Sequence, residues 1–366
     1  MSERGFSGSY LPEDVTFLLK RVELAPTEIA EKERLIQSGQ RHYSEMLSAE
    51  ERPDDAYLAL FEHALAVNRE RFAADVARLA RMLDVRHKGE IVLVSLARAG
   101  TPVGVLLRRA LLHLGRRAVH YSVSIVRDRG IDWVALDYVL GRHRAQDVVF
   151  VDGWTAKGAI AAELCSSVTA YNAARGAELD PGLVVVADLA GMATLAATDD
   201  DYVIPCSILN AVVSGLVSRT VLNVDVVGAG DFHACVYYRA LEPYDVSRRF
   251  VDDLSHAVER ALDDPAVTPI EWDAARRSRL AAISERFVNA CLVRYRLVDR
   301  NRVKPGIGEA SRALLRRLPE RLIVREPGAV DVGHLEHLAG ARRLTVEHDP
   351  GLPYRAAAII QTLGKG

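Results

Sequence analysis

The sequence has few cysteines and no long apolar segment. Its four cysteines, Cys165, Cys206, Cys235 and Cys291, lie far apart in a chain of 366 residues, so there is no CxxC ligand pair and no dense disulfide framework. The longest weakly polar run, residues 203–217, is too short to cross a bilayer, and the N-terminus lacks the apolar core of a signal peptide. The sequence therefore predicts a cytoplasmic protein in a reducing compartment, without a membrane partner.

The chain also has little net charge. Its 47 Lys and Arg against 49 Asp and Glu give −2, which argues against a nucleic-acid or membrane surface over the whole chain. The charge is unevenly distributed, because residues 285–366 have a net charge of +6 and the preceding residues −8. Since 366 residues exceed what one hydrophobic core usually serves and turn formers gather at 263–269, we predict domains at 1–270 and 285–366.

Apolar runs of strand length alternate with helical periods from residue 90 onward. This alternation is typical of parallel βαβ units, and runs that are apolar throughout belong in the middle of a doubly wound sheet. The N-terminal part shows three- and four-residue apolar steps, which predict helices packed on that sheet. The C-terminal residues predict a small separate α/β unit. The predicted strands are 91–96, 118–126, 147–152 and 183–189, with helices at 26–37, 54–83, 102–114 and 157–174.

The segment VVFVDGWTAKGAI at 148–160 predicts a strand, an acid at its end and a loop of small residues that leads into a helix. Backbone N–H groups at a helix N-terminus bind phosphate, because they point at the anion and the helix dipole adds to them. An ordinary glycine-containing turn is the alternative. The candidate residues are Asp152 at the strand end and the loop Thr155, Ala156, Lys157 and Gly158, where we expect the backbone of Lys157 to bind rather than its side chain.

A similar strand, turn and helix precede this segment at 92–111, where the turn consists of Ala97, Arg98, Ala99 and Gly100. Between the two units, Arg127 and Arg129 follow a predicted strand. These two arginines either close over an anion or stay solvated on the surface. Loops that follow neighbouring parallel strands meet at one edge of the sheet, so we expect both turns to line one site.

Together these segments resemble type I phosphoribosyltransferases, whose loops bind phosphoribosyl pyrophosphate (PRPP). The resemblance implies that Asp152 holds the ribose diol, that residues 155–158 hold the 5′-phosphate and that residues 97–100, Arg127 and Arg129 face pyrophosphate. It also implies Mg²⁺ bound through PRPP, with direct protein ligands unknown, and a base-like acceptor. Gly153 stands at the ribose where the family has a second acid, and Ile160 where it has a threonine.

Three other patterns allow different interpretations. Gly228 to Asp231 reads GAGD, which resembles the anion-hole motif of ribokinase-type sugar kinases. His233 and Cys235 lie two residues apart and suggest a cysteine peptidase, although a buried structural cysteine is the alternative. The patch containing His42, Tyr43 and Glu45 either caps a helix or lines an acceptor pocket. The candidate acceptor-pocket residues are His42, Tyr43, Glu45, Asp231 and His233.

The segment KPGIGEASRALLRRLPERLIV at 304–324 predicts a glycine-rich turn, a basic helix and a buried strand. It is similar to the RNA-binding domains of the Pelota and ribosomal L7Ae type, although Gly308 stands where many of them have asparagine. We expect RNA contacts with weak sequence preference. An oligomer interface or a cover for the active site is the alternative. The candidate RNA-binding residues are Lys304, Gly306, Glu309, Arg312 and Arg316.

The order of the two units, with RHYSEML and VDGWTAKGAI, resembles a bacterial family found with tellurite-resistance and stress operons. Some of its members are labelled cysteine proteases of the StiP type. The resemblance implies a Mg²⁺-dependent transfer of the phosphoribosyl group from PRPP to a base or base-like acceptor, giving a nucleotide-like product. RNA and a second copy of the chain are partners compatible with this organisation. A cysteine peptidase that uses Cys235 and His233, or a ribokinase-like kinase, is the alternative.

Overall fold

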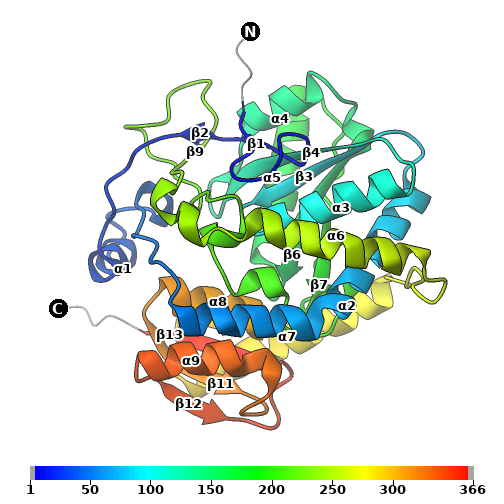
Figure 1. The fold of residues 1–366 in the computed structure, drawn as a ribbon. Helices are drawn as coiled ribbons and strands as arrows, with labels where there is room; N and C mark the ends of the chain where they lie inside the picture. Colours follow the sequence, from blue (N-terminus) through cyan, green and yellow to red (C-terminus); the bar gives the residue numbers. More distant parts are fainter. Residues whose placement is uncertain (1–4, 362–366) are drawn as a thin grey trace.

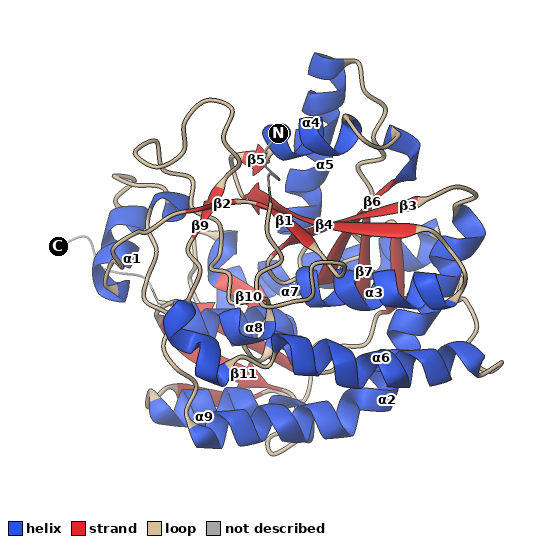
Figure 2. Cartoon of the chain, turned by 45° about the horizontal axis from the view of Figure 1, so that its top comes forward, coloured by secondary structure: helices blue, strands red, loops and turns tan. Residues whose placement is uncertain are grey.

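A seven-stranded sheet lies at the centre of the larger unit. The computed structural model describes residues 5–361 and orders six parallel strands β1-β4-β3-β6-β7-β8, with the short β5 antiparallel to β4 (Figures 1 and 2). The strands are β1 (Thr16–Leu18), β3 (Ile91–Ala97), β4 (Ala118–Val126), β5 (Gly130–Ile131), β6 (Val148–Thr155), β7 (Leu183–Asp188) and β8 (Leu195–Thr198).

Helices cover both faces of this sheet, because its inner strands are apolar on both sides. The long helix α2 (Asp55–Arg86), α3 (Thr101–His113) and α6 (Ser247–Asp263) pack against one another on one face. On the other face lie α4 (Trp133–Leu140) and α5 (Ala159–Arg175), as Figure 2 shows. Outside this layer are α1 (Ile29–Gln37) and the small pair of β2 (Lys20–Arg21) with β9 (Ala234–Cys235).

The C-terminal unit has a second sheet of its own. Its strand order is β10-β13-β11-β12, in which only the β11–β12 pair is parallel. Helices α8 and α9 pack on it, and α7 precedes it. The elements are α7 (Ala274–Arg294), β10 (Val303–Pro305), α8 (Gly306–Arg316), β11 (Pro319–Val324), α9 (Gly333–Ala341), β12 (Thr345–His348) and β13 (Ala356–Ile360).

The predicted α/β class with a parallel sheet is confirmed, and several details differ. Strand β6 continues to Thr155, which pairs with Asp188, so Gly153 and Thr155 belong to the strand rather than to the loop after it. Helix α7 was not predicted, and it extends across the predicted boundary between residues 270 and 285. The domain limits themselves stay predictions.

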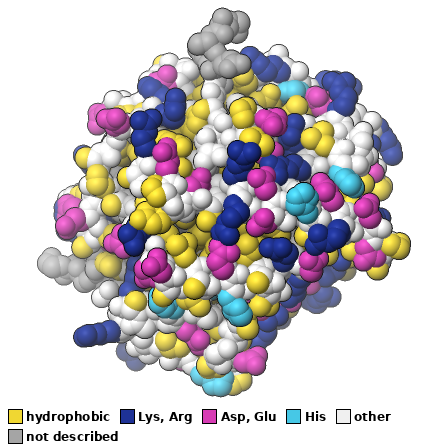
Figure 3. Space-filling model, in the orientation of Figure 1, with side chains coloured by type: hydrophobic (Ala, Val, Ile, Leu, Met, Phe, Trp, Pro, Cys, Tyr) yellow, Lys and Arg dark blue, Asp and Glu magenta, His cyan; other side chains and the backbone are white. Residues whose placement is uncertain are grey.

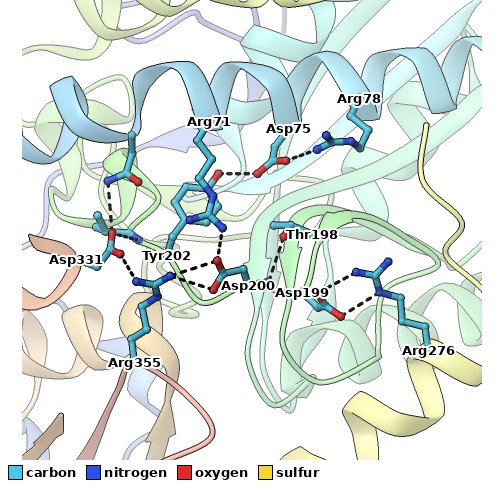
Figure 4. Close-up of polar contacts among 12 residues, drawn as sticks. Arg71, Asp75, Arg78, Thr198, Asp199, Asp200, Tyr202, Arg276, Asp331 and Arg355 are labelled. Carbon is cyan, nitrogen blue, oxygen red and sulfur yellow. Dashed lines mark hydrogen bonds and ion pairs between the residues drawn. The ribbon is translucent and has the colours of Figure 1, made fainter. Parts of the chain in front are cut away.

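Two consecutive aspartates after β8, Asp199 and Asp200, join the two units (Figure 4). Asp199 forms a two-point ion pair with Arg276 of α7, at 2.9 and 3.0 Å. Asp200 accepts hydrogen bonds from Arg71 of α2 and from Arg355, and Arg355 also pairs with Asp331 at 2.7 Å. Charged hydrogen bonds of this kind fix orientation as well as adding stability, so this loop holds α2, α7 and the C-terminal unit in one arrangement.

Charges of both signs are interspersed over the face shown in Figure 3. None of the helices between residues 5 and 361 combines the length and the apolar character needed to cross a membrane.

Candidate functional site

The turn after β3 packs against strand β6 rather than against the loop that follows this strand. A Cβ atom on Gly100 would lie 2.7 Å from the carbonyl oxygen of Val151, so only glycine allows this approach. Beside this point a cleft of about 710 Å³ separates the two units. Its charged lining is mostly cationic and includes Lys32, Arg127, Lys157, Arg219, Arg296, Arg302, Lys304, Arg312, Arg316 and Arg317, with Asp152, Asp299 and Glu309.

Asp152 lies at the base of this cleft and is 6% exposed. Burial raises the pKa of its carboxyl to about 6, against the charge of Arg312 and the Gly153 N–H, which donates to Asp152 Oδ1 at 2.7 Å. The carboxyl group is therefore able to exchange a proton near neutral pH.

Lys157 reaches across the cleft to the C-terminal unit. Its Nζ donates to the carbonyl oxygens of Arg300 at 3.0 Å and Val303 at 3.2 Å. Burial, and then the charge of Lys304, lower the pKa of this amine to about 7. Gly158 begins α5 with a φ of 76°, a left-handed conformation that glycine adopts without strain. The side chain of Lys157 is thus a bridge between the two units.

Helix α8 presents its polar face to the cleft. The guanidinium of Arg312 lies 4.3 Å from the ring centre of Trp154, and a Cβ atom on Gly308 would lie 2.3 Å from the same indole. Desolvation raises the pKa of the half-buried Glu309, but the charges of Lys304 and Arg312 outweigh it and lower this pKa. Of the predicted RNA residues, Lys304, Glu309, Arg312 and Arg316 line the cleft, while the Cα of Gly306 faces Leu189 and Asp201.

The loop between β4 and β5 lies over one side of the cleft. The backbone N–H of Arg127 donates to the hydroxyl of Tyr43 at 2.8 Å, and the guanidinium of Arg127 lies 5.5 Å from the centre of the Tyr43 ring. Arg129 is 3.7 Å from Glu45, and the N–H of Asp128 donates to Glu163. Arg127 and Tyr43 therefore line the cleft together, and Arg129 pairs beside it.

Arg98 does not point into the cleft, which corrects its predicted place beside Asp152. Its guanidinium is buried, with Nη1 donating to the Val217 carbonyl at 2.6 Å and Nη2 to Glu50 at 2.7 Å. The predicted acceptor-pocket residues divide into two groups, because His42 and Tyr43 lie together with ring centres 4.5 Å apart, whereas Asp231 and His233 contact other residues. His42 contacts Ser44, Asp231 pairs with Lys20 at 2.7 Å, and His233 contacts Ser124.

Three of the four cysteines are buried, and Cys165 alone is exposed on α5. Burial raises the pKa of Cys206 and of Cys235 to about 12 and that of Cys291 to about 11. Among residues 5–361 no group of three or more His, Cys, Asp or Glu side chains is arranged to hold a metal ion. The Mg²⁺ and PRPP expected from the resemblance stay predictions.

Sequence reasoning missed several cations of the site, among them Lys32 and Arg219. Burial lowers the pKa of Lys32 to about 8 and that of Arg219 to about 10. The predicted helix over 26–37 contains Lys32, but its amphipathic pattern does not single out a buried lysine. Arg219 lies in an irregular segment with no motif around it, so only the folded chain shows its place.

Two family models match the chain. Residues 8–255 match the model described as "Tellurite-like stress resistance cysteine protease StiP", and residues 282–362 match that of the PELOTA RNA binding domain. The chain is also 42% identical over 374 residues to the protein named "Cysteine protease StiP" of Acinetobacter baylyi, a match that covers 100% of this chain and 96% of the relative.

Matches among solved structures are distant. The hypoxanthine phosphoribosyltransferase of Trypanosoma cruzi is 15% identical, with a TM-score of 0.29 over 37% of this chain and 82% of that one. A variant of this enzyme with the product IMP is 17% identical, with a TM-score of 0.26 over 36% and 66%. TM-scores this low carry no argument. Because a protein with 42% identity is named a cysteine protease, the prediction of a phosphoribosyltransferase is wrong.

Proposed function

The chain belongs to the family of the tellurite-like stress resistance cysteine protease StiP, and we propose from this that it is a cysteine-dependent peptidase of a stress response. The observation that carries the proposal is the full-length match to a relative with that name. We assign Cys235 as the nucleophile and His233 as its base, the pair that the sequence suggests as an alternative.

The backbone supports this pair. The carbonyls of His233 and Cys235 both accept hydrogen bonds from the strand that contains Lys20, each at 2.9 Å, so this segment is extended. In an extended chain, side chains two residues apart project to the same side, about 6.6 Å apart along the strand. An imidazole at position 233 is therefore within reach of a thiol at position 235 once its present contact is released.

The pair is held apart in the conformation described. Nδ1 of His233 is 2.7 Å from the hydroxyl of Ser124, and the Cys235 side chain is fully buried. Burial lowers the pKa of His233 and raises that of Cys235 to about 12, so transfer of the thiol proton to the imidazole is unfavourable in this conformation. In catalysis the thiolate attacks the peptide carbonyl, and the imidazolium returns that proton to the leaving amine. Local opening around Cys235 has to precede this step, so the structure corresponds to a latent state.

Hydrolysis of a fluorescent casein substrate by the full chain tests this proposal. Cys235→Ser and His233→Gln should each abolish hydrolysis, because the nucleophile or its base is lost. The matched control is Cys165→Ser at the exposed cysteine, which should hydrolyse the substrate at the wild-type rate. Loss of activity in the control with full activity of Cys235→Ser would overturn the assignment. Full activity of a variant in which all four cysteines are replaced would overturn the proposal that the protein is a cysteine peptidase.

RNA binding is a second candidate function, supported by the PELOTA match and by the cationic lining of the cleft. Phosphate contacts release counterions, so affinity should fall steeply with salt. Filter binding of mixed RNA to the full chain tests this at several salt concentrations. Replacing Arg127 and Arg296 with glutamine should reduce the salt slope by about 1 for each lost phosphate contact. Arg86→Gln, at an exposed arginine outside the cleft, serves as the control. An equal reduction of the salt slope in the control and in the variant that lacks Arg127 and Arg296 would contradict binding in the cleft.

A further inference from the structure

A second cavity, of about 270 Å³, lies between the two units and is here called the arginine cavity. Its walls come from residues 47–54, the start of α2, residues 208–212 and helices α8 and α9. Its cations are Lys32, Arg52, Arg98, Arg219, Arg316 and Arg342, and its acids are Glu50, Glu51 and Asp54. Cations therefore outnumber carboxylates by two to one.

Four cations of the arginine cavity have few carboxylates beside them. Among the four cations Lys32, Arg98, Arg219 and Arg316, only Arg98 has a carboxylate within ion-pair distance in the described chain, Glu50 at 2.7 Å. Arg219 donates to backbone carbonyls of Tyr43 and Met46, and Lys32 donates to the hydroxyl of Ser48 at 2.7 Å. Dipoles of this kind stabilise a buried cation less than a carboxylate does.

Three polar atoms at this cavity are buried without a hydrogen-bond partner in the described part of the chain. They are Nε of Arg98, Nε of Arg316 and the hydroxyl of Tyr238. A buried donor with no acceptor costs about 1–3 kcal/mol, so folded chains normally satisfy it. Arg98 is 6% exposed, so its unpaired donor is not reached by bulk solvent. All three groups can donate, and none of them has an acceptor in the described part of the chain.

The arginines of the cavity also repel one another, which favours a negative charge between them. Burial, followed by the charge of Arg98, lowers the pKa of Arg316 well below its ordinary value, and the charge of Glu50 opposes this. Arg312 and Arg219 also repel Arg316. An anion between Arg98, Arg219 and Arg316 would remove this repulsion and satisfy the unpaired donors.

We propose that the arginine cavity binds a small oxyanion with two or more negative charges, of the phosphate or dicarboxylate class. Its volume is below the roughly 300 Å³ at which sites for drug-sized ligands begin, so it suits an anion of a few heavy atoms. The cavity adjoins the cleft and shares Lys32, Arg219 and Arg316 with it, whereas Glu50, Arg98 and Tyr238 line only the cavity, and Asp152 and Lys304 line only the cleft. A bound anion contacts α8 and α9 as well as the larger unit and thereby stabilises their packing.

Isothermal titration of the full chain with inorganic phosphate and with malonate tests the proposal and separates the two ligand sources. Saturable binding of one stoichiometric anion is expected. Tyr238→Phe should weaken it about tenfold, because one donor to the anion is lost. Glu50→Gln should tighten it, since Arg98 then keeps an amide acceptor but loses the competing negative charge. Lys304→Met in the cleft is the matched control and should leave the affinity unchanged.

Two results would overturn the proposal. One is the absence of saturable binding of either anion at low ionic strength in wild-type protein that circular dichroism shows to be folded. The other is an equal loss of affinity in Lys304→Met and in Tyr238→Phe, because this pattern would place the anion in the cleft instead. Tyr238→Phe removes only a hydroxyl, so a folding defect does not obscure the comparison, and its melting temperature without anion checks this directly.

Discussion

The carboxylate of Asp201 accepts the backbone N–H of Ile307 at 2.9 Å and so joins the loop after β8 to the first turn of α8. Its second oxygen accepts the N–H of Arg355 at 2.8 Å. Asp201 is 8% exposed, and burial raises the pKa of its carboxyl to about 6 despite these hydrogen bonds. One buried side chain therefore fixes two backbone segments of the C-terminal unit.

Asp201→Ala should destabilise the protein by about 2–4 kcal/mol, because two buried N–H groups lose their acceptor. Urea denaturation followed by circular dichroism measures this loss. Asp225→Ala is the control at an exposed aspartate and should change stability by less than about 0.5 kcal/mol. Equal stabilities of the two variants would contradict the bridging role of Asp201.

Asp152→Asn should stabilise the protein by about 2 kcal/mol at pH 7.5 and by much less at pH 4. The folded pKa of about 6 lies above the ordinary value of 3.8, so the folded state holds a proton that the unfolded state has lost between these pH values. Wild-type stability therefore falls as pH rises from about 4 to 6, and the amide removes this loss. Urea midpoints at several pH values measure the effect, and an unchanged pH profile would show that Asp152 titrates normally.

Lys157→Met should remove a stabilisation that appears as pH rises above 7. The folded pKa of about 7 lies below the ordinary 10.5, so in this window the unfolded state binds more protons and wild-type stability rises with pH. Between pH 7 and 9 the rise amounts to about 2 kcal/mol. Denaturation curves at both pH values measure it. The exposed Lys88→Met is the control and should keep the wild-type slope.

Iodoacetamide should modify Cys165 first, since it alone of the four cysteines is exposed. A latent peptidase further predicts that Cys235 is modified next, in urea concentrations below the unfolding transition, because local opening exposes it before global unfolding. Mass spectrometry of the digested protein identifies the modified residues. Simultaneous modification of Cys206, Cys235 and Cys291 at the main transition would contradict local opening.

The sequence predicts the inner strands well, because β3, β6 and β7 are continuous apolar runs bounded by turn formers. It does not predict β1 and β8, which have three and four residues and therefore too little pattern of their own. Their pairing with β4 and β7 depends on the neighbouring strand rather than on the local sequence.

The sequence indicates residues 152–158, which line the cleft, but it does not predict the direction in which the Arg98 side chain points. Asp152, which lies inside β6, and Lys157, which precedes α5, both line the cleft. Arg98 follows the same local pattern and nevertheless turns away, because Glu50 and the carbonyl of Val217 lie on its other side. These partners are distant in the sequence. The transferase prediction depended on local patterns of this kind, which do not determine an activity.

Helix α2 extends for 32 residues, about 48 Å, and packs against both units. Along it, Phe61 and Phe72 lie against α6, while Tyr57 lies beside His337 of α9 and Asn68 reaches Asp331. If the chain were cleaved near residue 270, the two fragments would therefore stay in contact through α2. Fragments cut there would each expose apolar side chains that the other half covers, and they would be expected to reassemble when mixed.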